Sequence, residues 1–225
     1  MKERPILFKG PLVRAILSGQ KTVTRRPLKM PHGFWETSAT GELVPIPANC
    51  PYGKPGDRLW VRETWGVISH DFDEHGNMID WEPDRPASPI REMPFGHGYY
   101  SGHVIYRADG EAAWAGDDDG GGDDRSAWKP SIHMPRIASR ILLEITDVRV
   151  ERLQDISDAE IEREGIDLDA LADGQDRYDM CHAGSGADGR PTLRTAWRHL
   201  WESTGGNWDG NPWVWVVEFK RVTPP

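Results

Sequence analysis

Cysteine is scarce in this sequence. The 225 residues contain two, Cys50 and Cys181, and neither shows the CxxC or HxxxH spacing that is typical of a zinc site. Zinc binding by a thiol together with a neighbouring histidine such as His182 is therefore the weaker interpretation. Such low cysteine usage is typical of a reducing compartment. We expect no metal ion and no other cofactor.

Long apolar runs are also missing. No stretch has the length and apolar character of a membrane-spanning helix, and the N-terminus resembles neither a signal peptide nor a transit peptide. We therefore expect a soluble, cytoplasmic protein with no membrane partner.

Basic residues are also fewer than acidic ones. The sequence contains 27 Lys and Arg and 36 Asp and Glu, which gives a net charge of −9. This balance argues against strong non-specific binding to duplex DNA. The distribution is uneven, since residues 1–30 hold eight basic residues and one acidic residue. The N-terminal segment can therefore still form a local surface that attracts anions.

Two patterns define the N-terminal part of the chain. The sequence KGPLVRAILSGQ (residues 9–20) predicts a short helix, with Pro11 in its first turn and Gly19 at its C-terminal cap. The sequence LWVRETW (residues 59–65) alternates as a strand does, which places four side chains on one face: Leu59, Val61, Glu63 and Trp65. A carboxylate on an apolar face needs a partner, and Arg26 or Arg62 can supply one.

Two later segments are polar. Residues 67–130 form a predicted insertion that is rich in His, Asp, Gly and Pro, and its acidic run 117–124 is a predicted loop rather than a calcium site, because EF-hand spacing is missing. Residues 166–190 are predicted to form a polar surface loop.

The C-terminal half alternates strands and helices. A strand is predicted from Ile141, a helix from Ser157 to Gly165 with Ser157 and Glu160 as a capping box, and a second helix that begins near Leu193. The sequence NPWVWVVEFKRV (residues 211–222) predicts a central strand. Glu164 falls in the last turn of its helix, where the helix dipole disfavours a carboxylate. The whole order predicts an α+β domain around a small curled sheet or barrel.

Four motifs carry a resemblance to a known family. They are SGQKTVTRR (residues 18–26), KPGDRLWVRETW (54–65), LQDISDAEIEREGI (153–166) and WVWVVEFKRV (213–222). In this order they resemble the ASCH domain family, which belongs to the PUA-like superfamily of small β-barrels. The longer signatures resemble the larger ASCH proteins of phages and prophages. The resemblance implies a single domain over 1–225, built on a PUA-like barrel with flanking short helices and the long insertion 67–130.

The resemblance also implies an activity. Some small bacterial ASCH proteins are amidohydrolases that remove the acetyl group from N4-acetylcytidine without a metal. By motif, their catalytic lysine, threonine and glutamate fall on Lys21, Thr24 and Glu164. Thr24 is then the nucleophile, Lys21 the base and Glu164 the residue that orients the lysine or carries a proton. In an ideal strand Lys21 and Thr24 face opposite ways, so the segment has to bend, or Thr22 takes the place of Thr24.

Five residues are assigned to substrate binding: Thr22, Arg25, Arg26, Glu63 and Trp65. Arg25 and Arg26 stabilise negative charge on the acyl oxygen or contact a phosphate, and Glu63 and Trp65 lie close to the motifs. An aromatic face at Trp60, Trp65 or Trp128 can stack on a base. The tryptophans at helix or strand spacing are instead assigned to the core: Trp197, Trp201, Trp213 and Trp215.

Several alternatives remain open. The chain is either an enzyme on a modified nucleoside, a module that binds RNA or a modified nucleotide without chemistry, or a ribonuclease on single-stranded RNA that uses Lys21, the arginines and His133. The partner is accordingly a nucleoside or single-stranded RNA. Lys21, Arg25 and Arg26 can also form a merely solvated basic edge, with Glu164 as a surface helix residue.

Overall fold

The computed structural model describes residues 1–29, 35–41, 43–46, 50–112, 128–182 and 189–223. They divide into two compact units. Unit 1 consists of Met1–Lys2, Ala15–Arg58 and Glu144–Arg221, and unit 2 consists of Glu3–Arg14, Leu59–Leu143 and Val222–Pro225. Each unit contains its own cluster of buried apolar side chains.

The sheet of unit 1 contains both strands that the sequence predicts in the C-terminal half, together with a strand at residues 23–27. Strand β12 (Trp213–Val222) lies between β11 (Leu142–Arg152) and β2 (Val23–Pro27). It pairs antiparallel with β2, so that Trp215 lies opposite Arg26 and Val217 opposite Thr24. Side chains on both faces of β12 are buried from Val214 to Val217, as expected for a central strand rich in β-branched and aromatic residues. A short ribbon of β3 (Trp35–Thr37) and β4 (Leu43–Pro45) also belongs to unit 1.

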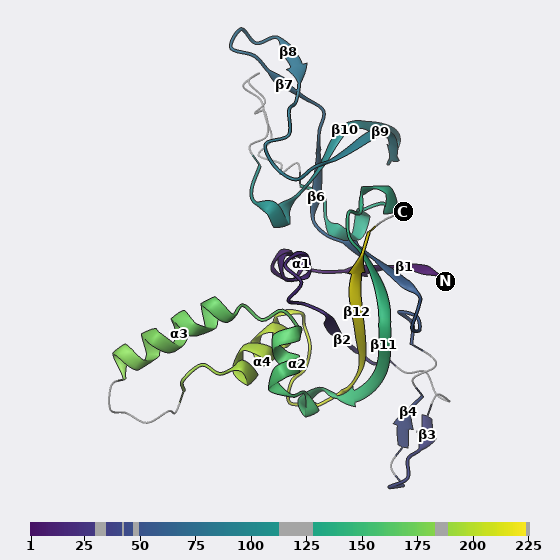
Figure 1. Ribbon diagram of the computed structural model, residues 1–225, viewed down its shortest axis with the longest axis vertical. Helices are drawn as coiled ribbons and strands as arrows, with labels where there is room; N and C mark the ends of the chain where they lie inside the picture. Colours follow the sequence, from purple (N-terminus) through teal and green to yellow (C-terminus); the bar gives the residue numbers. More distant parts are fainter. Residues whose placement is uncertain (30–34, 42, 47–49, 113–127, 183–188, 224–225) are drawn as a thin grey trace. The chain divides into compact units, whose positions relative to one another are not determined.

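Two helices of unit 1 begin at capping boxes. Helix α2 (Asp158–Arg163) begins after Ser157, which exchanges hydrogen bonds with Glu160 as predicted. Helix α4 (Leu193–Ser203) begins after Thr192, whose capping partner is Thr195. The two helices pack together, as Figure 1 shows. Because each cap satisfies backbone N–H groups that have no partner within the helix, both starts are set locally by the sequence.

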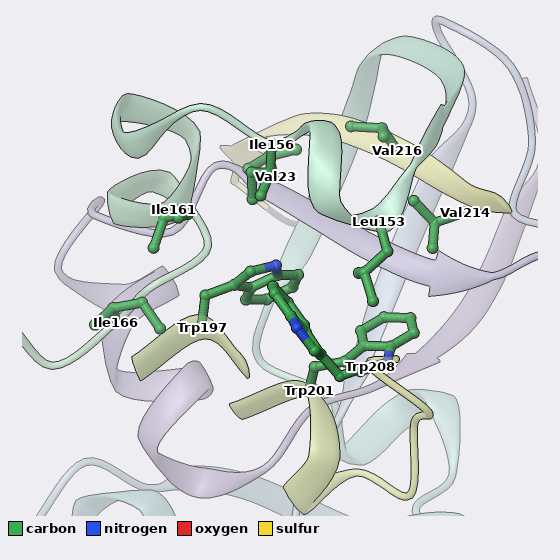
Figure 2. Close-up of a cluster of buried hydrophobic side chains, with 10 residues drawn as sticks. All are labelled: Val23, Leu153, Ile156, Ile161, Ile166, Trp197, Trp201, Trp208, Val214 and Val216. Atoms are coloured by element: carbon green, nitrogen blue, oxygen red, sulfur yellow. The ribbon is translucent and has the colours of Figure 1, made fainter. Parts of the chain in front are cut away.

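The apolar core of unit 1 is formed by these helices and the sheet. Figure 2 shows ten of its side chains, with Trp197 and Trp201 of α4 facing Val23 of β2 and Val214 of β12. Trp197 and Trp201 are buried, which confirms their assignment to the core. The core also includes Ile161 of α2 and Ile166, so the end of α2 is anchored on both sides of Glu164.

One prediction for unit 1 is wrong. The polar segment 166–190 is not a loop throughout, because residues Leu168–Cys181 form helix α3. Its N-cap Asp167 accepts a hydrogen bond from the backbone N–H of Ala170, and Gln175 donates to the carbonyl of Pro191. No residue of α3 is fully buried, so the sequence has no strong apolar stripe that would reveal a helix.

Unit 2 contains most of the remaining strands. Strand β5 (Arg58–Arg62) neighbours β1 (Glu3–Leu7). A separate three-stranded sheet has the order β6-β10-β9, with β6 at Trp65–Ile68, β10 at Gly98–Tyr106 and β9 at Ser88–Phe95. A two-stranded ribbon joins β7 (His70–Phe72) and β8 (Met78–Asp80). Much of the predicted insertion is therefore regular structure, whereas its acidic run 117–124 lies outside the described residues.

The predicted strand 59–65 is divided in two. Strand β5 ends at Arg62 and β6 begins at Trp65, with Glu63 and Thr64 between them. The predicted inward face is nevertheless buried at Leu59, Val61, Glu63 and Trp65, although Trp60 on the opposite face is buried as well. The pattern therefore gives the correct buried face although the backbone pairing changes in the middle.

The fold class is α+β, as predicted. The predicted N-terminal helix is present as α1 (Gly10–Leu17), and Gly19 follows it with a positive φ of 84°. The pairings among the described residues close no sheet on itself, so the predicted barrel is not confirmed. None of the described helices is long and apolar enough to cross a membrane.

Candidate functional site

Lys21 lies in unit 1, in the short connection that leads into β2. Its backbone N–H donates to the carbonyl of Ala15 over 2.9 Å, and the N–H of Thr22 donates to the carbonyl of Arg163 over 3.0 Å. The carbonyl of Thr22 in turn accepts from the N–H of Phe219 over 2.9 Å. The connection is therefore fixed by three separate segments. Because Lys21 precedes the strand, strict strand alternation does not determine where it points relative to Thr24.

Glu164 lies at the C-terminal end of α2, where its carboxyl group is buried, with 2% of the residue exposed. The next residue, Gly165, has a φ of +85°, and a Cβ there would lie 2.8 Å from the Cβ of Ala15 and 3.1 Å from the Cβ of Lys21. Only glycine fits both this backbone conformation and this close approach. Gly165 therefore allows the end of α2 to reach Lys21, and the alternative of Glu164 as a surface helix residue is wrong.

The Lys21 ammonium faces three oxygen atoms. Its Nζ lies 2.7 Å from the carbonyl oxygen of Val23, 2.7 Å from the carbonyl oxygen of Glu164 and 2.8 Å from Oε2 of Glu164. The residue is 2% exposed. A buried ammonium needs such partners, because the desolvation of one uncompensated ion destabilises the folded state by an amount on the order of several kcal/mol. The ion pair joins residues 143 positions apart in the chain.

Burial lowers the pKa of Lys21, and this is the largest influence on it. The Glu164 carboxylate acts in the opposite direction, while the positive charges of Arg26 and Arg25 lower the pKa of Lys21 further. A lysine with a lowered pKa can serve as a base closer to neutral pH than an exposed lysine can.

Arg25 is buried among carboxylates. One terminal nitrogen lies 3.3 Å from Oε1 of Glu164, and the other lies 2.8 Å from Oε2 of Glu151 and 3.1 Å from Oε2 of Glu160. None of its side chain is exposed. For Lys21 and Arg25, therefore, the alternative of a solvated basic edge is wrong.

Thr24 and Arg26 share the other face of β2, because side chains alternate along a strand. Thr24 is 3% exposed and lies opposite Val217, and Arg26 lies opposite Trp215. Burial lowers the pKa of Arg26, whereas Tyr52 and Glu164 raise it by their negative charge. The hydroxyl of Thr22 accepts a hydrogen bond from Nε of Arg163 over 3.0 Å, so Thr22 has a structural partner of its own.

Glu63 lies in unit 2 and is paired, although not with the predicted partner. Its two carboxylate oxygens each accept from Arg140 over 3.0 Å, and Arg140 also contacts Asp109 over 2.6 Å. The prediction of Arg26 or Arg62 as the partner is therefore wrong. Burial raises the pKa of Glu63, and the hydrogen bonds and charge of Arg140 oppose this rise. Nothing in the sequence distinguishes Arg140 from other arginines, since it lies 77 residues away.

Trp65 also lies in unit 2, within its core. It is 0% exposed, and its ring meets Phe95 edge to face with 5.2 Å between the ring centroids. The Lys129 ammonium lies 5.9 Å from its centroid. With no exposed ring surface, Trp65 as it stands offers no face on which a base can stack.

Sequence reasoning missed a second group of charged residues in unit 1. Arg149 contacts Glu151, Glu160 and Glu218, and Arg163 contacts Glu218 over 2.7 Å. These residues lie on β11, α2 and β12, so their proximity arises only from the tertiary fold. Within the ranges that the structure describes, no three His, Cys, Asp or Glu side chains gather as metal ligands would.

Comparison with known proteins gives one similarity. No family model and no curated protein matches the sequence. Among solved structures, the chain is similar to an ASCH domain from Lactobacillus crispatus JV V101, with 13% identity and a TM-score of 0.34, over 99% of this chain and 81% of that chain. A similarity at this level does not establish a shared fold. The site in unit 1 therefore has to be interpreted from its own residues.

Proposed function

We propose that this chain is an ASCH domain of the PUA-like superfamily and a metal-independent amidohydrolase. Its substrate is an N4-acylated cytidine or a related modified base, and its place of action is the cytoplasm. One observation carries the proposal: Lys21 and Glu164, which the motifs pair as catalytic residues, form a buried ion pair of 2.8 Å. The assignment of a lysine and a glutamate 143 residues apart is thus supported by their contact.

The proposed reaction begins with Thr24. Its hydroxyl attacks the acyl carbonyl carbon while its proton passes to the neutral amine of Lys21. The tetrahedral adduct then expels the N4 amine of cytidine, which receives a proton from Lys21. Water, deprotonated by Lys21 in the same manner, hydrolyses the acyl-threonine to a carboxylate and free Thr24. Arg26 lies on the same face of β2 as Thr24 and is assigned to the developing negative charge on oxygen.

For this reaction, Lys21 has to lose one proton from its ammonium. The carbonyl oxygens of Val23 and Glu164 are too weakly basic to take that proton. Oε2 of Glu164, at 2.8 Å, belongs to a carboxylate and is basic enough to take it. Glu164 is therefore assigned to carry the proton as well as to orient the amine. Burial favours this exchange, because a neutral amine beside a protonated carboxyl group avoids two desolvated charges.

The test is incubation of the purified protein with N4-acetylcytidine, with cytidine followed by chromatography. We expect turnover by the wild-type protein and a loss on the order of 10²–10⁴-fold in Lys21→Met and Thr24→Val, because each removes a group that moves the reacting proton. The matched control is Lys220→Met. Lys220 forms a similar ion pair of 2.9 Å with Glu144, but the Lys220 side chain is 60% exposed. Its turnover should equal that of the wild type.

Two results would contradict this proposal. Folded wild-type protein that leaves N4-acetylcytidine unchanged rules out that substrate, and Lys21→Met with wild-type turnover removes Lys21 from the chemistry. Circular dichroism of each variant separates lost chemistry from lost folding.

A second candidate is a module that binds RNA or a modified nucleotide without turnover. It is favoured by the three acceptors around Nζ of Lys21, which satisfy an ammonium well. Calorimetric titration with cytidine and with a single-stranded oligoribonucleotide distinguishes it: binding without product supports this candidate, and strand cleavage would support a ribonuclease instead.

A further inference from the structure

Arg25 has no open edge for a substrate. Its two terminal nitrogens are occupied by the carboxylates of Glu151, Glu160 and Glu164, at 2.8, 3.1 and 3.3 Å. Its Nε is buried too, and no hydrogen-bond partner for it occurs in the part of the chain that the structure describes. With 0% of the side chain exposed, a phosphate or an acyl oxygen would have to displace a carboxylate in order to reach it.

The carboxylates around Arg25 are themselves held in place. Arg149 contacts Glu151 over 2.5 Å and also contacts Glu160. It further contacts Glu218, which pairs with Arg163. The connected network contains four cations, Lys21, Arg25, Arg149 and Arg163, and five carboxylates, Asp147, Glu151, Glu160, Glu164 and Glu218. These several anchors make the orientation of Arg25 well defined.

Glu164 divides its two oxygens between two cations. Oε1 lies toward Arg25 and Oε2 lies toward Lys21. Fixing one oxygen of a carboxylate fixes the other, because the group is planar and rotates about a single bond. Without Arg25 the Glu164 side chain would retain its main-chain position but lose the contact that sets this rotation.

We infer that Arg25 is a positioning residue of the proposed site, which holds Oε1 of Glu164 so that Oε2 faces Lys21, and that it does not contact the substrate. The inference rests on the proposed function for its kinetic consequences. Its effect on Lys21 is a property of the folded protein and can be measured without substrate. The positive charge of Arg25 acts in the same sense, because it lowers the pKa of Lys21.

The experiment compares Arg25→Gln and Arg25→Lys with the wild type in two measurements. The first is the pH dependence of kcat and KM on N4-acetylcytidine. The second is an NMR titration of the Lys21 side chain in protein with ¹³C-labelled lysine, in which the Lys21 signal is assigned by its absence in Lys21→Met. Arg198→Gln serves as the control, because Arg198 forms an exposed pair with Glu202.

Removal of the Arg25 charge should change the pH at which Lys21 titrates. In Arg25→Gln, Lys21 should titrate at higher pH than in the wild type, because a neighbouring positive charge that lowers the pKa of Lys21 is gone. The acidic limb of the kcat/KM profile should move to higher pH together with it. In Arg198→Gln both should remain as in the wild type.

The conservative variant separates charge from geometry. Arg25→Lys retains a positive charge, so Lys21 should titrate close to its wild-type pH. A single ammonium cannot bridge three carboxylates as the guanidinium does, so kcat should fall on the order of tenfold to a hundredfold while KM changes less than about twofold. This variant also keeps the inference testable if Arg25→Gln does not fold.

Three outcomes decide the matter. A raised KM with unchanged kcat in Arg25→Lys would identify Arg25 as a substrate contact and overturn the inference. An unchanged Lys21 titration in folded Arg25→Gln would overturn it as well. If the wild-type protein shows no turnover, the proposed function fails, while the Lys21 titration still supports or overturns the role of Arg25.

Discussion

The two units each contain a buried group of charges, and the groups differ in what they can do. In unit 1, the Lys21 cluster (Lys21, Arg25 and Glu164) contains a lysine whose pKa burial lowers. In unit 2, the Arg140 cluster (Glu63, Asp109 and Arg140) is centred on an arginine. Burial alone would lower the pKa of Arg140, but its hydrogen bonds to Glu63 and Asp109 outweigh this and raise it.

This difference separates a reactive arrangement from a structural one. A lysine can give up its proton within the accessible pH range when burial lowers its pKa, whereas an arginine remains charged in proteins. Arg140 also stacks on Tyr106, with its guanidinium carbon 3.8 Å from the ring centroid. The contacts of Arg140 therefore keep its guanidinium charged, while the Lys21 cluster has a proton that can move.

The largest expected effect is the loss of stability when Arg140 is removed. Arg140→Met should destabilise the protein by about 3–5 kcal/mol, because Glu63 and Asp109 are left as buried charges without their partner. Urea unfolding followed by tryptophan fluorescence measures the loss. The control Arg198→Met removes an exposed ion pair and should cost about 0.5 kcal/mol or less. A loss at Arg140 no larger than in the control would mean that the Arg140 cluster does not stabilise unit 2.

A smaller loss of stability is expected in unit 1 from a substitution at Gly165 that changes no charge. Gly165→Ala should destabilise the protein by about 1–3 kcal/mol more than Gly205→Ala does, because the new Cβ meets Ala15 and Lys21. The two glycines have matching φ values of +85° and +84°, and nothing lies within 4 Å of a Cβ at Gly205. Thermal and urea unfolding of both variants measure the difference. Equal losses would show that backbone strain alone, and not the close approach to Lys21, requires glycine at position 165.

The smallest effect is a difference in pH dependence. Since the pKa of Glu63 is raised in the folded state, the folded protein holds that proton more tightly, and the contribution of Glu63 to stability falls as pH rises above about 4.5. Since the pKa of Lys21 is lowered, the unfolded chain binds the extra proton, and the contribution of Lys21 rises with pH in the window below 10.5.

Urea unfolding at a series of pH values checks both signs. The stability difference between wild type and Glu63→Gln should decrease with rising pH in the acidic window. The difference between wild type and Lys21→Met should increase with rising pH in the alkaline window. Slopes of the same sign in both comparisons would contradict the contrast between the clusters.

The sequence predicts the local features of this fold well. Helix starts at Ser157 and the buried face of 59–65 depend on neighbouring residues, and both are present in the structure. Helix α3 was not predicted because none of its residues is fully buried, so the sequence has no strong apolar stripe at helical spacing. The division between β5 and β6 was not predicted either, because alternation continues across the break.

Contacts over long distances in the chain could not be predicted from the residues alone. The pairing of Lys21 with Glu164 was indicated by motifs shared with a family, whereas the partner of Glu63 had no such guide and was predicted wrongly. The roles of Arg149 and Glu151 were missed because charged residues on separate elements show no pattern until the strands are paired. Whether Thr24 acts as the nucleophile stays a prediction.

Two of the oxygens that contact the Lys21 ammonium belong to the main chain, at Val23 and Glu164. No substitution of one side chain deletes a carbonyl group. Substitutions can therefore change the basicity of this lysine only through neighbouring side chains, while these two contacts are retained with the backbone. Related sequences that retain Lys21 and the connection between α1 and β2 would therefore retain these two hydrogen bonds to its amine, whichever substrate they bind.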